Sequence, residues 1–61
     1  MRTKKTVTEV RLENGTIADL TATATGINIV TYSGSIFYFD ATITKRDARE
    51  LAAALLELAN D

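Results

Sequence analysis

The fold of this chain is decided by residues 27–43, which read INIVTYSGSIFYFDATI. Apolar and aromatic residues alternate with other residues along this stretch, as is typical of β-strands. Ser33 and Gly34 interrupt the alternation and predict a turn. We therefore expect two strands here, one from Ile27 to Thr31 or Tyr32 and one from Ser35 to Ile43.

The alternation leaves apolar side chains on both sides of these strands. Successive side chains of a strand point to opposite faces of the sheet, so both faces are expected to be partly apolar. One side holds Ile27, Ile29, Phe37, Phe39, Ala41 and Ile43. The other side holds Val30, Tyr32, Ile36 and Tyr38, mixed with Asn28, Asp40 and Thr42. We expect a helix to cover the first side and the second side to be an interface.

Two further strands are predicted upstream, from Thr6 to Leu12 and from Thr16 to Ala24. Residues 13–15, Glu-Asn-Gly, form a strong turn signal, because Asn and Gly tolerate positive φ. A three-residue loop with a left-handed Gly15 separates apolar from polar side chains better than a two-residue loop does. The expected pairs are Leu12 with Thr16, Val10 with Ala18, and Thr8 with Leu20. The same reasoning favours an odd loop at residues 32–34.

The remaining residues predict a helix. Thr44 is a good N-cap residue, and Asp47 follows three positions later. Apolar residues then recur at helical spacing: Ala48, Leu51, Ala52, Leu55, Leu58 and Ala59. Asn60 and Asp61 are expected to end the helix. The predicted fold is α+β, a four-stranded antiparallel β-meander with one C-terminal helix packed on one face, in a single domain of residues 6–61 that follows a basic arm of residues 1–5.

Length and composition favour an oligomer. At 61 residues the chain is near the lower limit for folding alone. Small domains usually need a disulfide, a metal or a partner subunit. The chain has no cysteine and no histidine, so oligomerisation is the remaining means of stabilisation.

Catalysis and cofactor binding are not expected. Without Cys or His there is no ordinary catalytic triad, no thiolate metal site and no redox centre. Asp19 and Asp40 share a face and could in principle act as an acid–base pair. We interpret them instead as solvated strand residues that discourage edge pairing.

The charge pattern gives little reason to expect nucleic acid or membrane binding. The formal net charge is −1, and the basic arm holds only Arg2, Lys4 and Lys5, which is usual for a solubilising terminus. No apolar core follows the arm as in a signal peptide, and no apolar run is long enough to span a bilayer. A cytoplasmic location is therefore the default expectation.

One candidate ligand site combines the helix start with the tyrosines. Lys45 and Arg46 follow the cap at Thr44, and two cations beside free backbone N–H groups would suit a phosphate or carboxylate. Tyr32 and Tyr38 could stack on a ring, with Arg11 and Asn28 supplying polar contacts. The alternatives are a solvated first turn, in which Asp47 and Glu50 offset the cations, and a protein–protein interface, where tyrosine is also enriched.

The sequence thus predicts a small, non-enzymatic, homo-oligomeric binding protein. Its size and composition are similar to those of small oligomeric proteins with which phages block host defences or sequester nucleotide signals. The first hypothesis is an accessory protein of this kind that holds an anionic, nucleotide-like ligand between subunits. The alternative is a protein–protein interaction module, an inhibitor or dimerisation domain, that acts on a host protein or on a second copy through the exposed sheet face.

Overall fold

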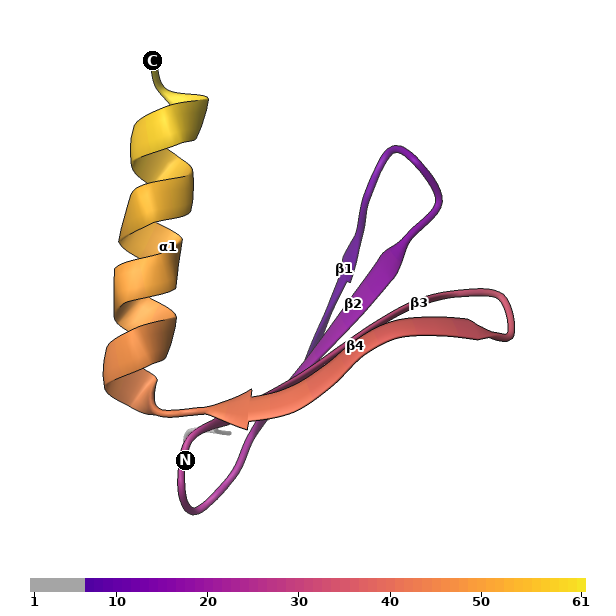
Figure 1. The fold of residues 1–61 in the computed structure, drawn as a ribbon, viewed down its shortest axis with the longest axis horizontal. Coiled ribbons are helices and arrows are strands. Elements are labelled where there is room, and N and C mark those ends of the chain that lie inside the picture. Colours follow the sequence, from indigo (N-terminus) through magenta and orange to yellow (C-terminus); the bar gives the residue numbers. More distant parts are fainter. Residues whose placement is uncertain (1–6) are drawn as a thin grey trace, which may run out of the picture.

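The computed structural model describes residues 7–61 as one antiparallel sheet followed by one helix (Figure 1). The elements are β1 (Val7–Arg11), β2 (Ile17–Ala22), β3 (Ile27–Ser33), β4 (Ile36–Ile43) and α1 (Lys45–Ala59). The strand order is β1-β2-β3-β4, so each strand pairs with its neighbour in sequence. The α+β class and the four-stranded antiparallel meander are therefore confirmed. The predicted basic arm and Thr6 lie outside the described residues.

The first hairpin has the predicted loop. Gly15 adopts a positive φ of +92°, which a glycine accepts without the steric cost of a side chain. The Leu12 N–H donates to the Thr16 carbonyl at 2.9 Å, and the Gly15 N–H donates to the Leu12 carbonyl at 3.1 Å. Val10 pairs with Ala18 and Thr8 with Leu20. The predicted register of β1 and β2 is thus confirmed.

The loop from β2 to β3 lies close to the end of β4. Thr23 closes this loop, because its N–H donates to the Gly26 carbonyl at 2.8 Å and its hydroxyl accepts from the Gly26 N–H at 3.0 Å. Gly26 is the single buried residue among the described positions. A Cβ atom there would overlap the carbonyl oxygen of Ile43. Glycine is therefore required here by close backbone approach.

The second hairpin differs from the prediction. Its loop has two residues, Gly34 and Ser35, rather than an odd number, and Ser33 pairs with Ile36. Gly34 has a φ of +59°, as expected for hairpin turns with glycine in the first loop position. A β-bulge follows at Tyr38, since Tyr32 pairs with Phe37 whereas Thr31 pairs with Phe39.

The bulge changes which face some aromatic side chains occupy. Residues paired directly across strands share a face, so Phe39 lies with Thr31 and Phe37 lies with Tyr32. The prediction that Phe37 and Phe39 share a face is therefore wrong. The prediction that Ile36 shares a face with Tyr32 is also wrong, because Ile36 pairs with Ser33 on the other side. A single inserted residue reverses the alternation, and the bulge supplies that residue.

The two faces of the sheet differ in character. The register places one set of mainly apolar side chains together, which we call the apolar face: Val10, Ala18, Leu20, Ala22, Ile27, Ile29, Ile36, Phe39, Ala41 and Ile43, with Thr8, Thr31 and Ser33 as its polar members. The opposite side, which we call the polar face, carries Val7, Glu9, Arg11, Ile17, Asp19, Thr21, Asn28, Val30, Tyr32, Phe37, Asp40 and Thr42.

The helix begins as predicted. The hydroxyl of Thr44 accepts a hydrogen bond from the Asp47 N–H at 3.0 Å, and the Thr44 carbonyl accepts from the Ala48 N–H at 2.9 Å. The helix ends at Ala59, and the N–H of Asn60 donates to the Leu56 carbonyl at 3.0 Å. Local capping chemistry therefore sets the start of α1.

The helix does not pack on the sheet of its own chain, which is contrary to the prediction. In Figure 1, α1 rises from the end of β4 and stands well apart from the hairpin of β1 and β2. Only Thr44 lies between β4 and α1. Connections between a strand and a helix that packs back on the sheet usually have 2–6 residues. The connection here is shorter than this range, and the helix extends away from the sheet.

Candidate interaction surface

The most unusual feature of the described residues is that no side chain in 7–61 is buried. Large apolar side chains are instead exposed on both the sheet and the helix. They are Val7, Val10, Leu12, Ile36, Phe37, Tyr38, Phe39, Leu51, Leu55, Leu56 and Leu58, each at least 39% exposed. The molecule is therefore a sheet and a helix that lack a shared hydrophobic core.

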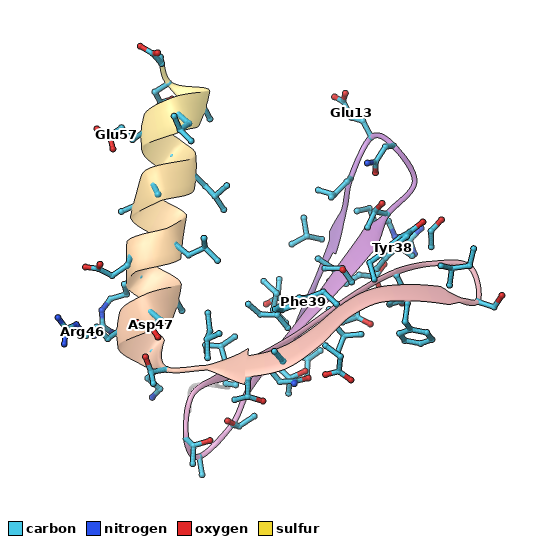
Figure 2. The ribbon with its side chains drawn as sticks, viewed as in Figure 1. Glu13, Tyr38, Phe39, Arg46, Asp47 and Glu57 are labelled. Carbon is cyan, nitrogen blue, oxygen red and sulfur yellow. The ribbon has the colours of Figure 1, made fainter. Side chains whose placement is uncertain are left out.

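The helix contributes a continuous apolar stripe to this surface. Leu51 and Leu55 are 51% and 61% exposed, and Ala48, Ala52 and Ala59 lie between or beside them at helical spacing. Figure 2 shows Arg46 and Glu57 on the side of α1 that faces away from the sheet. Leu55 lies about 160° around the helix from Glu57 at 100° per residue. The stripe therefore lies on the side of α1 toward the sheet, without being covered by it.

The sheet contributes its apolar face. Figure 2 shows Tyr38 and Phe39, which are consecutive residues, on the same side of β4, the side from which α1 rises. Strict alternation would place them on opposite sides, and the bulge at Tyr38 brings them together. We call the apolar face and the stripe of α1 together the open apolar surface. Its two parts come from different elements and enclose no core between them.

The polar face, in contrast, supplies partners for its own charges. Glu9, Asp19 and Asp40 lie in one cross-strand row, with Val30 between the last two. The Arg11 Nε–H donates to Glu9 Oε2 at 2.6 Å. The side-chain amide of Asn28 donates to the Thr42 hydroxyl at 3.1 Å, and its contact with Asp40 is longer, at 3.4 Å. These contacts leave a hydrated surface with an acidic row.

Tyr32 lies on the polar face with part of its ring already occupied. Its ring centroid is 5.4 Å from that of Phe37, at an interplanar angle of 32°. Partial burial and the neighbouring carboxylate of Asp19 raise the pKa of Tyr32 above its ordinary value. An anionic ligand beside Tyr32 would therefore lie near the acidic row.

The predicted ligand-binding residues do not come together within one chain. Arg11 and Tyr32 lie in one row of the polar face, with Ile17 between them, and Arg11 is paired with Glu9. Tyr38 lies at the bulge, on the other side of the sheet from Tyr32.

The other predicted ligand contacts lie farther along β4. Asn28 pairs with Thr42 toward the helix end of the sheet. Lys45 and Arg46 begin α1, seven and eight residues beyond Tyr38, and the hydroxyl of Thr44 is used by the cap. A site that combined the cations with a tyrosine would need residues from more than one subunit.

The open apolar surface is the feature that sequence reasoning missed. The predicted interface was the second sheet face, because the helix was expected to cover the first. The signal was present in the single residue, Thr44, that separates the strand pattern from the helix pattern. That short connection already argued against a helix folded back on its own sheet.

Metal and membrane sites are not apparent in the described part of the chain. No group of three or more acidic side chains in residues 7–61 is placed to hold a metal ion. Over the same residues, no helix has the length and hydropathy needed to cross a bilayer. Comparison with known protein families, with curated proteins and with solved structures finds no match to this chain.

Proposed function

We propose that this protein is a non-enzymatic protein–protein interaction module that binds through its open apolar surface. The observation that carries the proposal is the exposure of Phe39, Leu51 and Leu55 in residues that bury no side chain at all. Monomeric proteins rarely leave contiguous apolar patches of more than a few hundred Å² exposed, and larger patches usually mark interaction sites.

The free energy of burying apolar surface favours the interaction module over the nucleotide-binding hypothesis. Removing apolar surface from water stabilises a protein by about 25 cal/mol for each Å². In this chain the apolar side chains of the sheet and the helix stay exposed, so they do not contribute this stabilisation. A bound protein surface would recover it. The nucleotide hypothesis needs cations near an aromatic ring, whereas Lys45 and Arg46 lie at the opposite end of β4 from Tyr32.

The proposed absence of catalysis is supported by the placement of the carboxylates. Asp19 and Asp40 are separated by one strand, which corresponds to about 10 Å. They lie on an open sheet face rather than in a closed pocket that could hold a substrate between them. The cytoplasmic location inferred from the sequence stays a prediction.

A phage-type accessory protein that holds an anionic, nucleotide-like ligand between subunits is the second candidate. One observation favours it. Lys45 and Arg46 are exposed at the start of α1, and within residues 7–61 the structure shows no ion pair for either of them. Both cations are thus available to an anion, with Asp47 as the nearest opposing charge in the first turn.

Photo-crosslinking in cells tests the interaction module. A photoreactive amino acid placed at Leu55 should form adducts with protein, because that position lies in the apolar stripe. The same amino acid at Glu57, on the opposite side of α1, is the matched control and should form few adducts. Mass spectrometry identifies what is attached. Equal and low yields at the two positions would contradict the proposed function.

A further inference from the structure

We propose that the partner on the open apolar surface is a second copy of this chain, and that α1 of each copy packs on the apolar face of the other copy's sheet. This inference rests on the proposed function and names its partner. A twofold arrangement of this kind would cover both parts of the surface with one repeated contact.

The exposed area has the size that a stable dimer needs. The chain exposes 5283 Å², whereas a compact monomer of its mass, 6.6 kDa, exposes about 3,900 Å². The difference is about 1,400 Å² per chain. A standard interface buries about 800 Å² on each partner. This is somewhat more than half of the difference, so the exposed area can supply a stable interface.

The dimensions of the helix and the sheet also match. The 15 residues of α1 make a helix about 22 Å long. The strands have between 5 and 8 residues, which corresponds to about 16–26 Å. A helix of this length laid along the strands covers the apolar face from end to end.

The chain's own helix is poorly placed to provide this cover. Thr44 alone joins β4 to α1, and its backbone is extended, with φ −70° and ψ 160°. Folding α1 back would require the backbone to leave this geometry within a connection of one residue. The helix of a second copy is not limited by this connection. A second copy is therefore the favoured source of the helix that covers the apolar face.

Charge argues against the polar face as the dimer interface. A twofold contact through that face would bring the acidic row of Glu9, Asp19 and Asp40 near the same row of the partner. Like charges brought together at an interface are unfavourable. Edge pairing of β4 is also disfavoured, because the bulge at Tyr38 interrupts its outer edge.

Site-directed crosslinking tests this arrangement, and the absence of native cysteine makes the experiment clean. The variant Ala18→Cys with Leu55→Cys places one thiol on the apolar face and one on the helix stripe. The matched control, Thr21→Cys with Leu55→Cys, places the sheet thiol on the polar face of the same strand. A short bis-maleimide should join two chains in the first variant, and much less in the control, on a denaturing gel.

The outcomes separate the possible arrangements. Sedimentation of the unmodified protein should give twice the monomer mass, together with the crosslinked dimer. A crosslink within one chain would show that the helix folds back, and would overturn the proposal. A dimer mass for the Ala18→Cys, Leu55→Cys variant itself, without a crosslink between its chains, would overturn the helix-on-sheet arrangement.

A further outcome distinguishes this inference from the proposed function. A monomer mass, combined with adducts at Leu55 that contain only some other protein, would overturn the second copy as partner and leave the interaction module standing. A monomer mass with no protein adducts at Leu55 would overturn both.

Discussion

Gly26 shows how a single residue without a side chain fixes the geometry of this fold. The β2–β3 loop passes so close to the end of β4 that a Cβ atom would overlap the carbonyl oxygen of Ile43. Ile43 directly precedes the cap of α1, so this contact influences where the helix starts. Glycine at this position thus allows the loop to lie against the strand end from which the helix begins.

Gly26→Ala is expected to destabilise the fold by about 1–3 kcal/mol, the usual cost of forcing extra atoms into a packed position. Backbone atoms of Ile43 and Thr44 must shift to make room. Denaturant unfolding monitored by circular dichroism measures the change. Gly15→Ala serves as a comparison, because a Cβ there meets nothing within 4 Å and only the positive φ opposes it. An unchanged midpoint for Gly26→Ala would mean that the two segments do not approach as described.

Tyr32 provides a residue-level test of the polar face. Partial burial and Asp19 raise the pKa of Tyr32 above 10.0. The folded state therefore binds the phenolic proton more tightly than the unfolded state does. This contribution to stability is complete below pH 10 and is lost as the pH rises through the folded-state pKa.

Asp19→Asn is expected to lower the pKa of Tyr32 toward its ordinary value. Spectrophotometric titration of the phenol measures it, in a Tyr38→Phe background so that only one tyrosine reports. The matched control is Asp40→Asn, which removes a carboxylate from the same row two strands away from Asp19. A pKa that responds equally to both variants would argue against a specific influence of Asp19.

At the scale of elements, α1 carries an electrostatic conflict. Cations near a helix N-terminus are unfavourable by about 0.3–1 kcal/mol each, because the backbone dipoles place positive charge there. Lys45 and Arg46 occupy the first two positions of α1, and Asp47 is the acidic residue of the first turn. These two cations therefore slightly oppose formation of the helix.

Replacing Lys45 and Arg46 with Gln is therefore expected to leave the melting temperature unchanged or to raise it slightly. If the second candidate function is correct, the same variant loses the stabilisation that nucleotides or nucleotide-derived signals give to the original chain. Thermal melts with and without such compounds measure both effects. If no phosphate-bearing compound shifts the melt of the original chain, the nucleotide hypothesis fails.

The elements also show which parts of the fold were predictable. The Asn14–Gly15 loop and the Thr44 cap were predicted because each depends on residues close together in sequence. The loop at Gly34 was not predicted correctly. Ile29 and Phe39 lie on one face if the loop has an odd number of residues, and they also do so if a two-residue loop is followed by a bulge. Alternation alone cannot separate these two solutions, and they differ in where Phe37 lies.

The candidate site was less predictable than the strands. The periodicity of Leu51 and Leu55 identifies the side of α1 that is apolar, and says nothing of which sheet covers it. The residues chosen for a ligand were selected by chemistry, and Tyr38 and Arg46 proved to lie on separate parts of the molecule. Placement of that kind depends on the tertiary arrangement rather than on local pattern.

At the scale of the whole molecule, Leu55 distinguishes a lone chain from an assembly. Leu55 and Leu56 are 61% and 63% exposed, so in a lone chain their replacement by alanine should have similar, small effects. In the proposed dimer Leu55 lies at the centre of the buried stripe and Leu56 at its edge. Leu55→Ala should then cost about 2–5 kcal/mol, as for a buried leucine, and Leu56→Ala clearly less.

Melting curves recorded over a range of protein concentrations measure this difference. The melting temperature of the original chain should rise with concentration, as mass action requires for a folded dimer. Leu55→Ala should lower it at every concentration. Equal losses for the two leucines, or a melting temperature independent of concentration, would contradict a buried stripe.

The lack of buried side chains in residues 7–61 also bears on how a cell would regulate this protein. In the proposed assembly a newly synthesised copy stays sensitive to proteases until it meets another. Scarce copies would be degraded before they find each other, whereas abundant copies would protect one another. The surviving amount would then rise more steeply than the rate of synthesis.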